Sequence, residues 1–168
     1  MKEIKVETLS REVFYEFGSY SDLLHPDGVY LGDIPARFYR DRVTASYDPA
    51  SLVAFGVNEI YPREKNTLEK TEHHFNTCEV LMPMDGDIII HVGPARKEPV
   101  YSEFRAFLIP KGTLVCLRPG VFHGGPYTAG AEIVHVMLAL PELMYKKDCH
   151  FYFPEAPLEI VQETGGKA

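Results

Sequence analysis

The chain has 168 residues, 45% of them hydrophobic and 24% charged, and its formal net charge is -7. This size and composition fit one globular domain with a full core, so we expect a single domain over residues 1–160 and a loose polar tail over residues 161–168. The acidic balance argues against nucleic acid and against an anionic membrane surface as partners, and leaves a small molecule as the expected ligand.

Neither the N-terminus nor the cysteines point to secretion. The first residues carry charges throughout without the apolar core of a signal peptide, and no apolar run approaches the length of a membrane span. Cys78, Cys116 and Cys149 are odd in number and form no CxxC pattern, which favours reduced thiols. We therefore expect a cytoplasmic protein.

A short helix is the first predicted element. Apolar residues recur with helical spacing between Leu9 and Phe17, Ser10 can cap the start, and Gly18 can end the helix. Beyond Gly28 the pattern changes to short segments that are rich in β-branched and aromatic residues and bounded by turn residues. The predicted strands are Ala36–Arg42, Ser51–Val57, Leu68–His74, Glu79–Met82, Asp87–Val92, Phe104–Ile109, Thr113–Leu117 and Glu132–Leu140.

The links between these strands predict the fold class. Asp85-Gly86 and Pro119-Gly120 predict tight turns, residues 94–102 a long polar loop, and residues 141–147 a last helical turn. Strands this short and evenly spaced are typical of an antiparallel sandwich or barrel, and not of a βαβ sheet. We therefore expect an all-β fold with a short N-terminal helix.

The first segment with metal-ligand chemistry is 72–79. Residues two apart on a strand share a face, so Glu72 and His74 point the same way and His73 points the other way. A turn near residues 75–77 can bring the chain back so that Glu79 faces the same space. Two carboxylates and an imidazole can then gather on one wall.

The second such segment, 112–123, ends in His123 just after the Pro119-Gly120 turn. If the strands close into a barrel, Glu72, His74, Glu79 and His123 can converge in its interior. This set suits a divalent Mn, Fe, Ni or Zn ion, and three protein ligands with Glu72 further off would leave positions open for water or substrate. Polar residues at a barrel mouth without a metal are the alternative interpretation.

Further polar side chains are candidates for the pocket wall or for binding a substrate carboxylate. They are Arg105, Lys111, Tyr39, Tyr127 and His135. A solvated charge or a core aromatic ring is the simpler interpretation of each, and a structural role is the simpler one for His91. We expect His73 to face solvent or the other sheet, His25 and His150 to lie at the surface, and Cys78 and Cys116 to lie in the core.

Both segments resemble the paired motifs of the cupin superfamily. The first motif there runs His-x-His, three or four residues, Glu, six residues and Gly; here His74, Glu79 and Gly86 match, and Glu72 stands at the first His. The second motif is matched by Gly112, Gly120 and His123, with Arg118-Pro119 in place of Pro-x. The resemblance implies a double-stranded β-helix, also called a jelly-roll barrel, which is often a homodimer.

Within the cupins the chain resembles the ureidoglycolate lyases. The resemblance runs in register through residues 9–18, 71–84, 105–107 and 118–123. It departs at Glu79, where those enzymes tend to have Gln, at Gly124, where they tend to have a second His, and near Asn58-Glu59, where they tend to have Arg. The extra carboxylates favour a metal over direct binding of an anion by Arg.

The resemblance implies an enzyme that splits ureidoglycolate into glyoxylate and urea. Whichever of Glu72 and Glu79 is not a firm ligand is the candidate catalytic base. A metal-dependent sugar isomerase or epimerase is the alternative, since two carboxylates, two imidazoles and an aromatic-rich cavity would suit a polyol. A non-catalytic cupin that binds a small metabolite is the third hypothesis.

Overall fold

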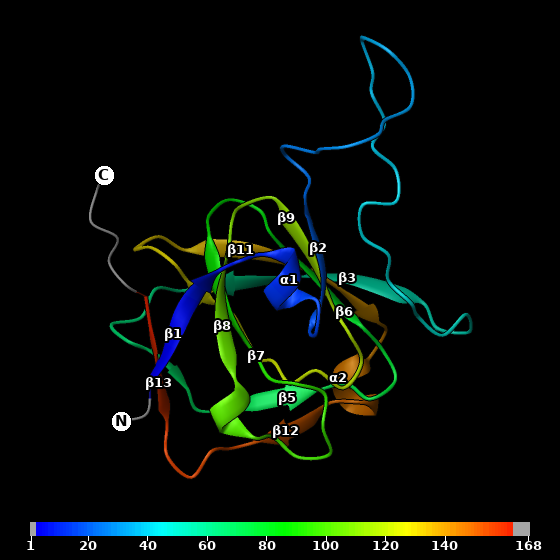
Figure 1. The fold of residues 1–168 in the computed structure, drawn as a ribbon. Coiled ribbons are helices and arrows are strands. Elements are labelled where there is room, and N and C mark those ends of the chain that lie inside the picture. The colour runs from blue at the N-terminus through cyan, green and yellow to red at the C-terminus, as the bar shows by residue number, and fades with distance from the viewer. Residues whose placement is uncertain (1–2, 163–168) are drawn as a thin grey trace.

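The computed structural model describes residues 3–162 of the chain, nearly all of them in strands and loops (Figure 1). The strands are β1 (Glu3–Thr8), β2 (Gly18–Asp22), β3 (Val53–Ile60), β4 (Asn66–Leu68), β5 (Thr71–His73), β6 (Glu79–Pro83), β7 (Ile88–Val92), β8 (Arg105–Ile109), β9 (Thr113–Leu117), β10 (Tyr127–Thr128), β11 (Val134–Pro141), β12 (His150–Tyr152) and β13 (Leu158–Val161). The helices are α1 (Arg11–Phe14), the 3-10 turn η1 (Tyr101–Glu103) and α2 (Met144–Lys147).

Two sheets form the barrel. One has the order β10-β7-β8-β1-β13-β4, the other has the order β2-β9-β6-β11-β3, and β12 pairs with β5 as a separate ribbon. Most neighbours run antiparallel, while β1 lies parallel to both β8 and β13. The all-β fold with a short N-terminal helix is therefore confirmed. No helix among residues 3–162 is long and apolar enough to cross a membrane.

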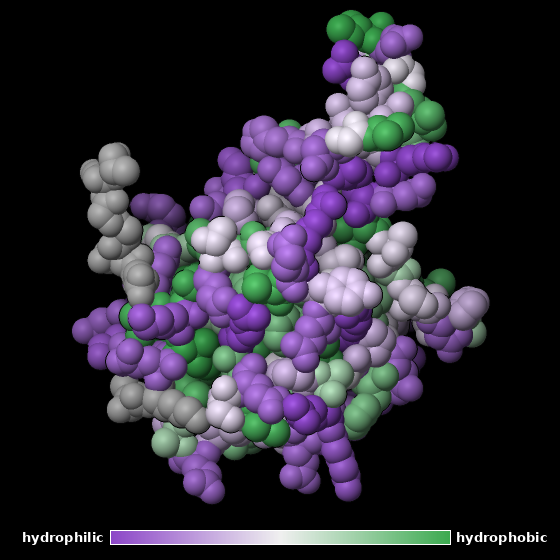
Figure 2. Space-filling model, viewed as in Figure 1, coloured by the Kyte–Doolittle hydropathy of each residue, from purple (hydrophilic) through white to green (hydrophobic). Residues whose placement is uncertain are grey.

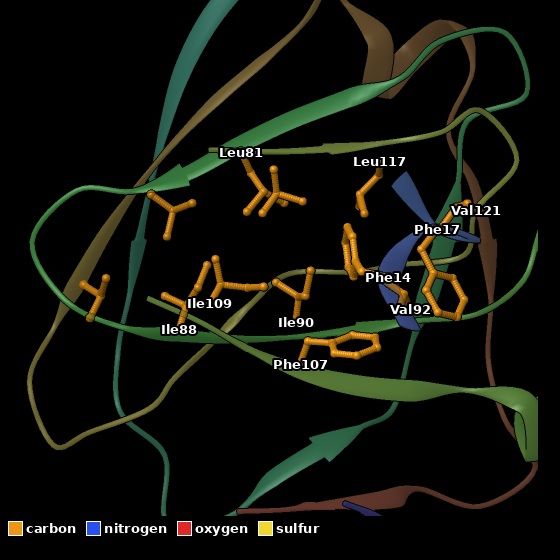
Figure 3. Packing of buried hydrophobic residues seen from close by; sticks show 13 residues of the cluster. Phe14, Phe17, Leu81, Ile88, Ile90, Val92, Phe107, Ile109, Leu117 and Val121 are labelled. Atoms are coloured by element: carbon orange, nitrogen blue, oxygen red, sulfur yellow. The ribbon is translucent and has the colours of Figure 1, made fainter. Parts of the chain in front are cut away.

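The main core fills the space between the two sheets. Alternate residues on each strand point inward, as the pleat requires, and these side chains face one another in Figure 3. The buried members of this cluster are Phe14, Phe17, Leu81, Ile88, Ile90, Val92, Phe107, Ile109, Val115, Leu117, Val121, Val134 and Val136. The barrel interior between the sheets is thus largely filled with apolar side chains.

Both sheets also carry apolar residues on their outer faces. On the six-stranded sheet, Ile89, Ala106 and Phe122 belong to a second buried cluster. On the five-stranded sheet, a third cluster is made of Cys78, Val80, Cys116 and Ala139, and Val43 and Tyr47 pack against it. The predicted core positions of Cys78 and Cys116 are confirmed, and both thiols are free.

Several predicted elements differ from the structure. Ala36–Arg42 is not a strand, because this segment pairs only through a single bridge between Leu31 and Phe38. The predicted strand Leu68–His74 is divided into β4 and β5, which pair with different partners. The strands β1, β2, β10, β12 and β13 were not predicted, because their sequences are short or strongly charged.

The predicted tail over residues 161–168 begins inside a strand. Val161 lies in β13 and pairs in register with Lys5 of β1, so the strand extends into the region expected to be a tail. Residues 163–168 lie outside the described residues.

The packing of α1 into the barrel yields a stability prediction. Phe107 is fully buried, and its ring lies 5.3 Å from that of Phe14 and 6.0 Å from that of Phe17. We expect Phe107→Ala to lower the free energy of unfolding by about 3–5 kcal/mol, because removing the ring leaves a cavity between α1 and β8 and removes their packing contact. Urea denaturation followed by circular dichroism measures this change.

The control for that measurement is Phe153→Ala, since the Phe153 side chain is 70% exposed. It should change the free energy of unfolding by no more than about 0.5 kcal/mol. A loss for Phe107→Ala as small as that of the control would contradict the role assigned to this packing.

Candidate metal centre

Three of the predicted ligands come from the ends of different strands. His74 directly follows β5, Glu79 is the first residue of β6, and His123 follows the turn after β9. Glu79 shares the inward face of β6 with Leu81, a member of the barrel core. The three side chains therefore meet at the end of the packed interior.

Backbone hydrogen bonds join the two motif segments. The amide of Glu72 donates to the carbonyl of His123 (2.6 Å) and the amide of His123 donates to the carbonyl of Glu72 (2.8 Å). The amide of Gly120 donates to the carbonyl of His74 (2.6 Å). Gly120 has φ +80°, a backbone conformation that glycine adopts at little cost, so the motif glycine makes this turn possible.

The ligand atoms of the triad lie within 4.8 Å of one another. Nε2 of His74 and Nε2 of His123 each lie 3.2 Å from Oε2 of Glu79. The side chains of His74 and His123 are only 5% and 4% exposed, and that of Glu79 is 11% exposed. Two imidazoles and one carboxylate at this spacing could hold a divalent metal ion.

A hydrogen bond at Nδ1 of each imidazole fixes which nitrogen faces the centre. Nδ1 of His74 donates to the carbonyl of Asp148 (2.6 Å), and Nδ1 of His123 donates to the carbonyl of Val121 (2.8 Å). A carbonyl oxygen only accepts, so each Nδ1 carries a proton and Nε2 is the nitrogen that faces the centre, where a metal would take its lone pair. Such outer hydrogen bonds orient metal-ligating histidines in proteins.

Buried charge couples Glu79 to His123. Burial raises the pKa of Glu79, but the charge and hydrogen bonds of His123 and His74 outweigh it and lower the pKa to about 2. Burial lowers the pKa of His123, and the carboxylate of Glu79 reverses this effect and raises the pKa to about 9. Without a metal, a proton on His123 compensates the buried carboxylate.

Asp148 ties the C-terminal segment to the centre. Besides the carbonyl that orients His74, its carboxylate accepts hydrogen bonds from the amides of Phe75 (3.0 Å) and Asn76 (2.8 Å). These amides belong to the turn that carries the chain from β5 to β6. Asp148 therefore holds both a ligand and the loop between two ligands.

Glu72 lies beside the triad but outside it. Its backbone pairs with that of His123, so the two side chains lie on the same face, and its charge contributes to the raised pKa of His123. The thiol of Cys149 donates a hydrogen bond to Oε2 of Glu72 (3.0 Å). Burial first, and the Glu72 carboxylate second, raise the pKa of Cys149 to about 12, so the thiol stays protonated.

Three of the candidate substrate-binding residues have neighbours outside the triad. Arg105 binds Glu7 through two nitrogens, and the hydroxyl of Tyr127 donates to the carbonyl of Thr67 (3.0 Å) in the outer cluster. Lys111 precedes Gly112, whose amide bonds to Pro83 at the other end of β6 from Glu79. Among residues 3–162, no hydrogen bond or ion pair joins these three side chains to His74, Glu79 or His123, and a role in substrate binding stays a prediction.

His135 is the fourth of these candidates. Its register opposite Glu59 places it near the Asp85 turn, and its ring lies beside the carboxylates of Asp85 and Glu59. The prediction that it lines the pocket is wrong, because Val134 and Val136 occupy the inward positions of β11.

Other polar residues take structural roles. His73, expected to face solvent or the other sheet, is fully buried and its ring stacks on Phe122 at 4.5 Å, which rules out the solvent alternative. His91 is buried beside the Tyr127 hydroxyl, and burial lowers its pKa to about 3, which keeps it neutral. The remaining polar candidates are peripheral: His25 and His150 are exposed, and Tyr39 stacks near Tyr30 outside the barrel.

Gly124 explains one departure from the lyase pattern. A Cβ atom at this position would lie 2.8 Å from Cε1 of His91 and 3.3 Å from the carbonyl of Lys70. The buried ring of His91 thus takes the room that a second motif histidine would need. Asp148 and Cys149 were missed for a different reason: they lie some 70 residues from the first motif, and only the pairing of β12 with β5 brings them back.

The fold is an all-β barrel of two facing sheets, with a candidate metal centre at the end of its interior. No protein-family model matches the chain, and no curated protein matches it in sequence. Solved structures that it resembles include a dTDP sugar isomerase from Desulfovibrio desulfuricans, with 12% identity over 76% of this chain and 82% of the other and a TM-score of 0.48.

Two further solved structures resemble the chain to a comparable degree. A dTDP-4-dehydrorhamnose 3,5-epimerase from Bacillus anthracis is 14% identical over 76% of this chain and 71% of the other, with a TM-score of 0.42. The Bacillus subtilis oxalate decarboxylase with Mn(II) centres is 17% identical over 66% of this chain, with a TM-score of 0.41; this chain spans 24% of its length. None of these likenesses bears on the activity of this chain.

Metal content tests the triad directly. We expect near-stoichiometric Mn, Fe, Ni or Zn after reconstitution and its loss in His123→Ala, because that substitution removes one of three ligand atoms. Elemental mass spectrometry on protein purified without chelator or affinity nickel measures it. His135→Ala is the matched control and should keep the metal; equal retention in both variants would contradict the site.

The raised pKa of His123 predicts how metal affinity depends on pH. The metal needs the Nε2 lone pair, which is protonated below a pKa of about 9, so affinity rises as the pH rises toward that value. Between about pH 6 and pH 8 the dissociation constant should fall about tenfold per pH unit, with about one proton released per metal bound. Calorimetric titration in buffers of different ionisation enthalpy measures both, and an affinity independent of pH would contradict the prediction.

Proposed function

We propose that the chain is a metal-dependent cupin enzyme that acts on a small hydroxy- or ureido-carboxylate, in its most specific form a ureidoglycolate lyase. One observation carries this proposal: the two Nε2 atoms and the Glu79 carboxylate converge, while a second carboxylate, Glu72, lies beside them outside the ligand set. This arrangement separates a ligand carboxylate from a carboxylate that is available as a base.

The donor set fits a divalent ion that accepts nitrogen and oxygen ligands. His74, Glu79 and His123 would hold it, and the absence of a thiolate from these three favours Mn, Fe, Ni or Zn over Cu(I). When bound, the ion would bind the carboxylate and hydroxyl oxygens of the substrate and lower the pKa of that hydroxyl.

Glu72 would act as the base. Its carboxylate would take the hydroxyl proton of ureidoglycolate, the O–H electron pair would become the second C–O bond of glyoxylate, and the C–N pair would leave with nitrogen. The proton held by Glu72 would then pass to that nitrogen, which completes urea and restores the carboxylate. Atoms and charge balance without a further reactant.

Cys149 would keep Glu72 in place. The thiol donates to Oε2 of Glu72 and, with its raised pKa, stays protonated, so the second carboxylate oxygen is left for the substrate. Asp148, the preceding residue, orients His74. One short segment would therefore hold the base and a ligand in a fixed relation.

A metal-dependent sugar epimerase or isomerase is the second candidate. A base beside a chelating metal could equally take a proton from carbon next to a carbonyl, and the placement of Glu72 beside His123 suits that reaction too. Turnover of sugar nucleotides with none of ureidoglycolate would favour this candidate. Saturable binding of a metabolite without turnover of either would favour a non-catalytic cupin.

The role of Glu72 has a direct test. We expect Glu72→Gln to keep its metal and to lose at least about 100-fold in turnover of ureidoglycolate, since the amide cannot accept the proton. Urea release and metal content are measured on the same preparation.

Glu69→Gln is the matched control, because Glu69 is an exposed carboxylate three residues away that accepts a hydrogen bond from the nearby Thr67 hydroxyl (3.4 Å). It should retain both metal and turnover. Full activity in Glu72→Gln would remove Glu72 as the base, whereas joint loss of metal and activity would make Glu72 a ligand.

A further inference from the structure

The outer face of the five-stranded sheet is apolar as far as its edge strand. On β3, Val53, Phe55 and Val57 point outward, because Ile60 on the opposite parity packs against the barrel core. Phe55 is 76% exposed and Val57 is 60% exposed. We call Val53, Phe55 and Val57 the β3 strip; it lies beside Met137 and Ala139 of β11 in register.

A long excursion leaves the barrel beside this sheet. Residues 23–52 join β2 to β3, and Figure 1 shows them projecting well beyond the body of the barrel. Residues 28–41, the arm hairpin, close on themselves through the Leu31–Phe38 bridge and through Arg37, which lies 4.6 Å from the centre of the Tyr30 ring. The hairpin is therefore formed, although it has little contact with the barrel.

The arm hairpin exposes apolar side chains at its far end. Val29 is 85% exposed, Ile34 81% and Phe38 63%, and hydrophobic residues are visible at the end of the projection in Figure 2. Loops without secondary structure are seldom this long in compact domains unless they have a function. An ordered hairpin that presents apolar residues to solvent indicates a surface that meets a partner.

The returning limb of the excursion shows how the sheet face is covered. Val43 and Tyr47 pack against the cluster around Cys78 and Ala139, and the Tyr47 hydroxyl donates to the Ala139 carbonyl (2.9 Å). This cover ends before β3, which, within residues 3–162, pairs with β11 alone and is an edge of its sheet. An apolar edge strand of eight residues is a site for association unless something covers it.

The exposed apolar area is a large part of what an interface needs. Leu52, Val53, Phe55, Val57, Val29, Leu31, Ile34 and Phe38 are large apolar side chains with substantial exposure. Burying a side chain of this kind removes on the order of 100 Å² from water. Together they supply a large apolar share of the about 800 Å² per partner that a stable protein interface buries.

We propose that a second copy of this chain covers these residues, with the arm hairpin of each protomer packed on the β3 strip of the other. Both surfaces lie on one chain and do not cover each other, and a two-fold axis covers both at once through two equal contacts. A single partner, a second copy of the chain, thus accounts for the exposure of both the apolar hairpin and the apolar edge strand. This inference is independent of the metal centre and of the proposed reaction.

The test is the oligomeric state of the full chain by sedimentation equilibrium. The wild type is expected at twice the chain mass of 19.0 kDa. A strip variant, Phe55→Arg with Val57→Arg, and a hairpin variant, Ile34→Arg with Phe38→Arg, should each raise the dimer dissociation constant at least about 100-fold. Phe153→Arg, an exposed aromatic residue after β12, is the control and should remain dimeric.

Mixing the two variants tests the reciprocal arrangement and checks that both fold. A heterodimer would retain one intact contact, between the hairpin of the strip variant and the strip of the hairpin variant, so the mixture should form dimers that neither variant forms alone. A monomeric wild type at about 100 μM, variants that dimerise like the control, or a mixture of folded monomers without rescue would each overturn the proposal.

Discussion

The pair of backbone hydrogen bonds between Glu72 and His123 fixes the geometry on which the candidate centre depends. It joins the first motif, at the end of β5, to the turn after β9, which lies about 50 residues further along the chain. Once this pair has formed, His123 and Glu72 share a face and His74 follows on the same loop. The ligands are thus placed by main-chain pairing before any metal binds, which limits the ordering that metal binding requires.

The packed barrel interior explains why the chemistry lies at one end. Inward residues from Leu81 to Val136 fill the space between the sheets, and Phe14 and Phe17 of the N-terminal segment close it further. A buried carboxylate is costly unless charge and hydrogen bonds compensate it. Glu79 meets this condition through two imidazoles whose other nitrogens are already bonded to carbonyls. Polar and apolar parts of the interior are therefore segregated along the strands.

The segment after β11 links the candidate site to the rest of the fold. Asp148 orients His74 and holds the β5–β6 turn, Cys149 bonds to Glu72, and β12 then pairs with β5. Glu142 at the start of this segment bonds to Leu52, next to the β3 strip. The proposed dimer surface and the candidate centre are therefore attached to the same stretch of chain, although each can be tested without the other.

The sequence by itself determined the all-β class, the short N-terminal helix and the three residues of the candidate metal site, His74, Glu79 and His123, because strand alternation and motif spacing are local properties. Only the tertiary structure decided the rest. It placed Glu72 outside the triad, turned His135 outward and brought Asp148 and Cys149 to the site, since strand register and pairing depend on residues far apart in the chain. Ala36–Arg42 has strand-like residues but no partner strand, and a strand forms only where its backbone groups find one.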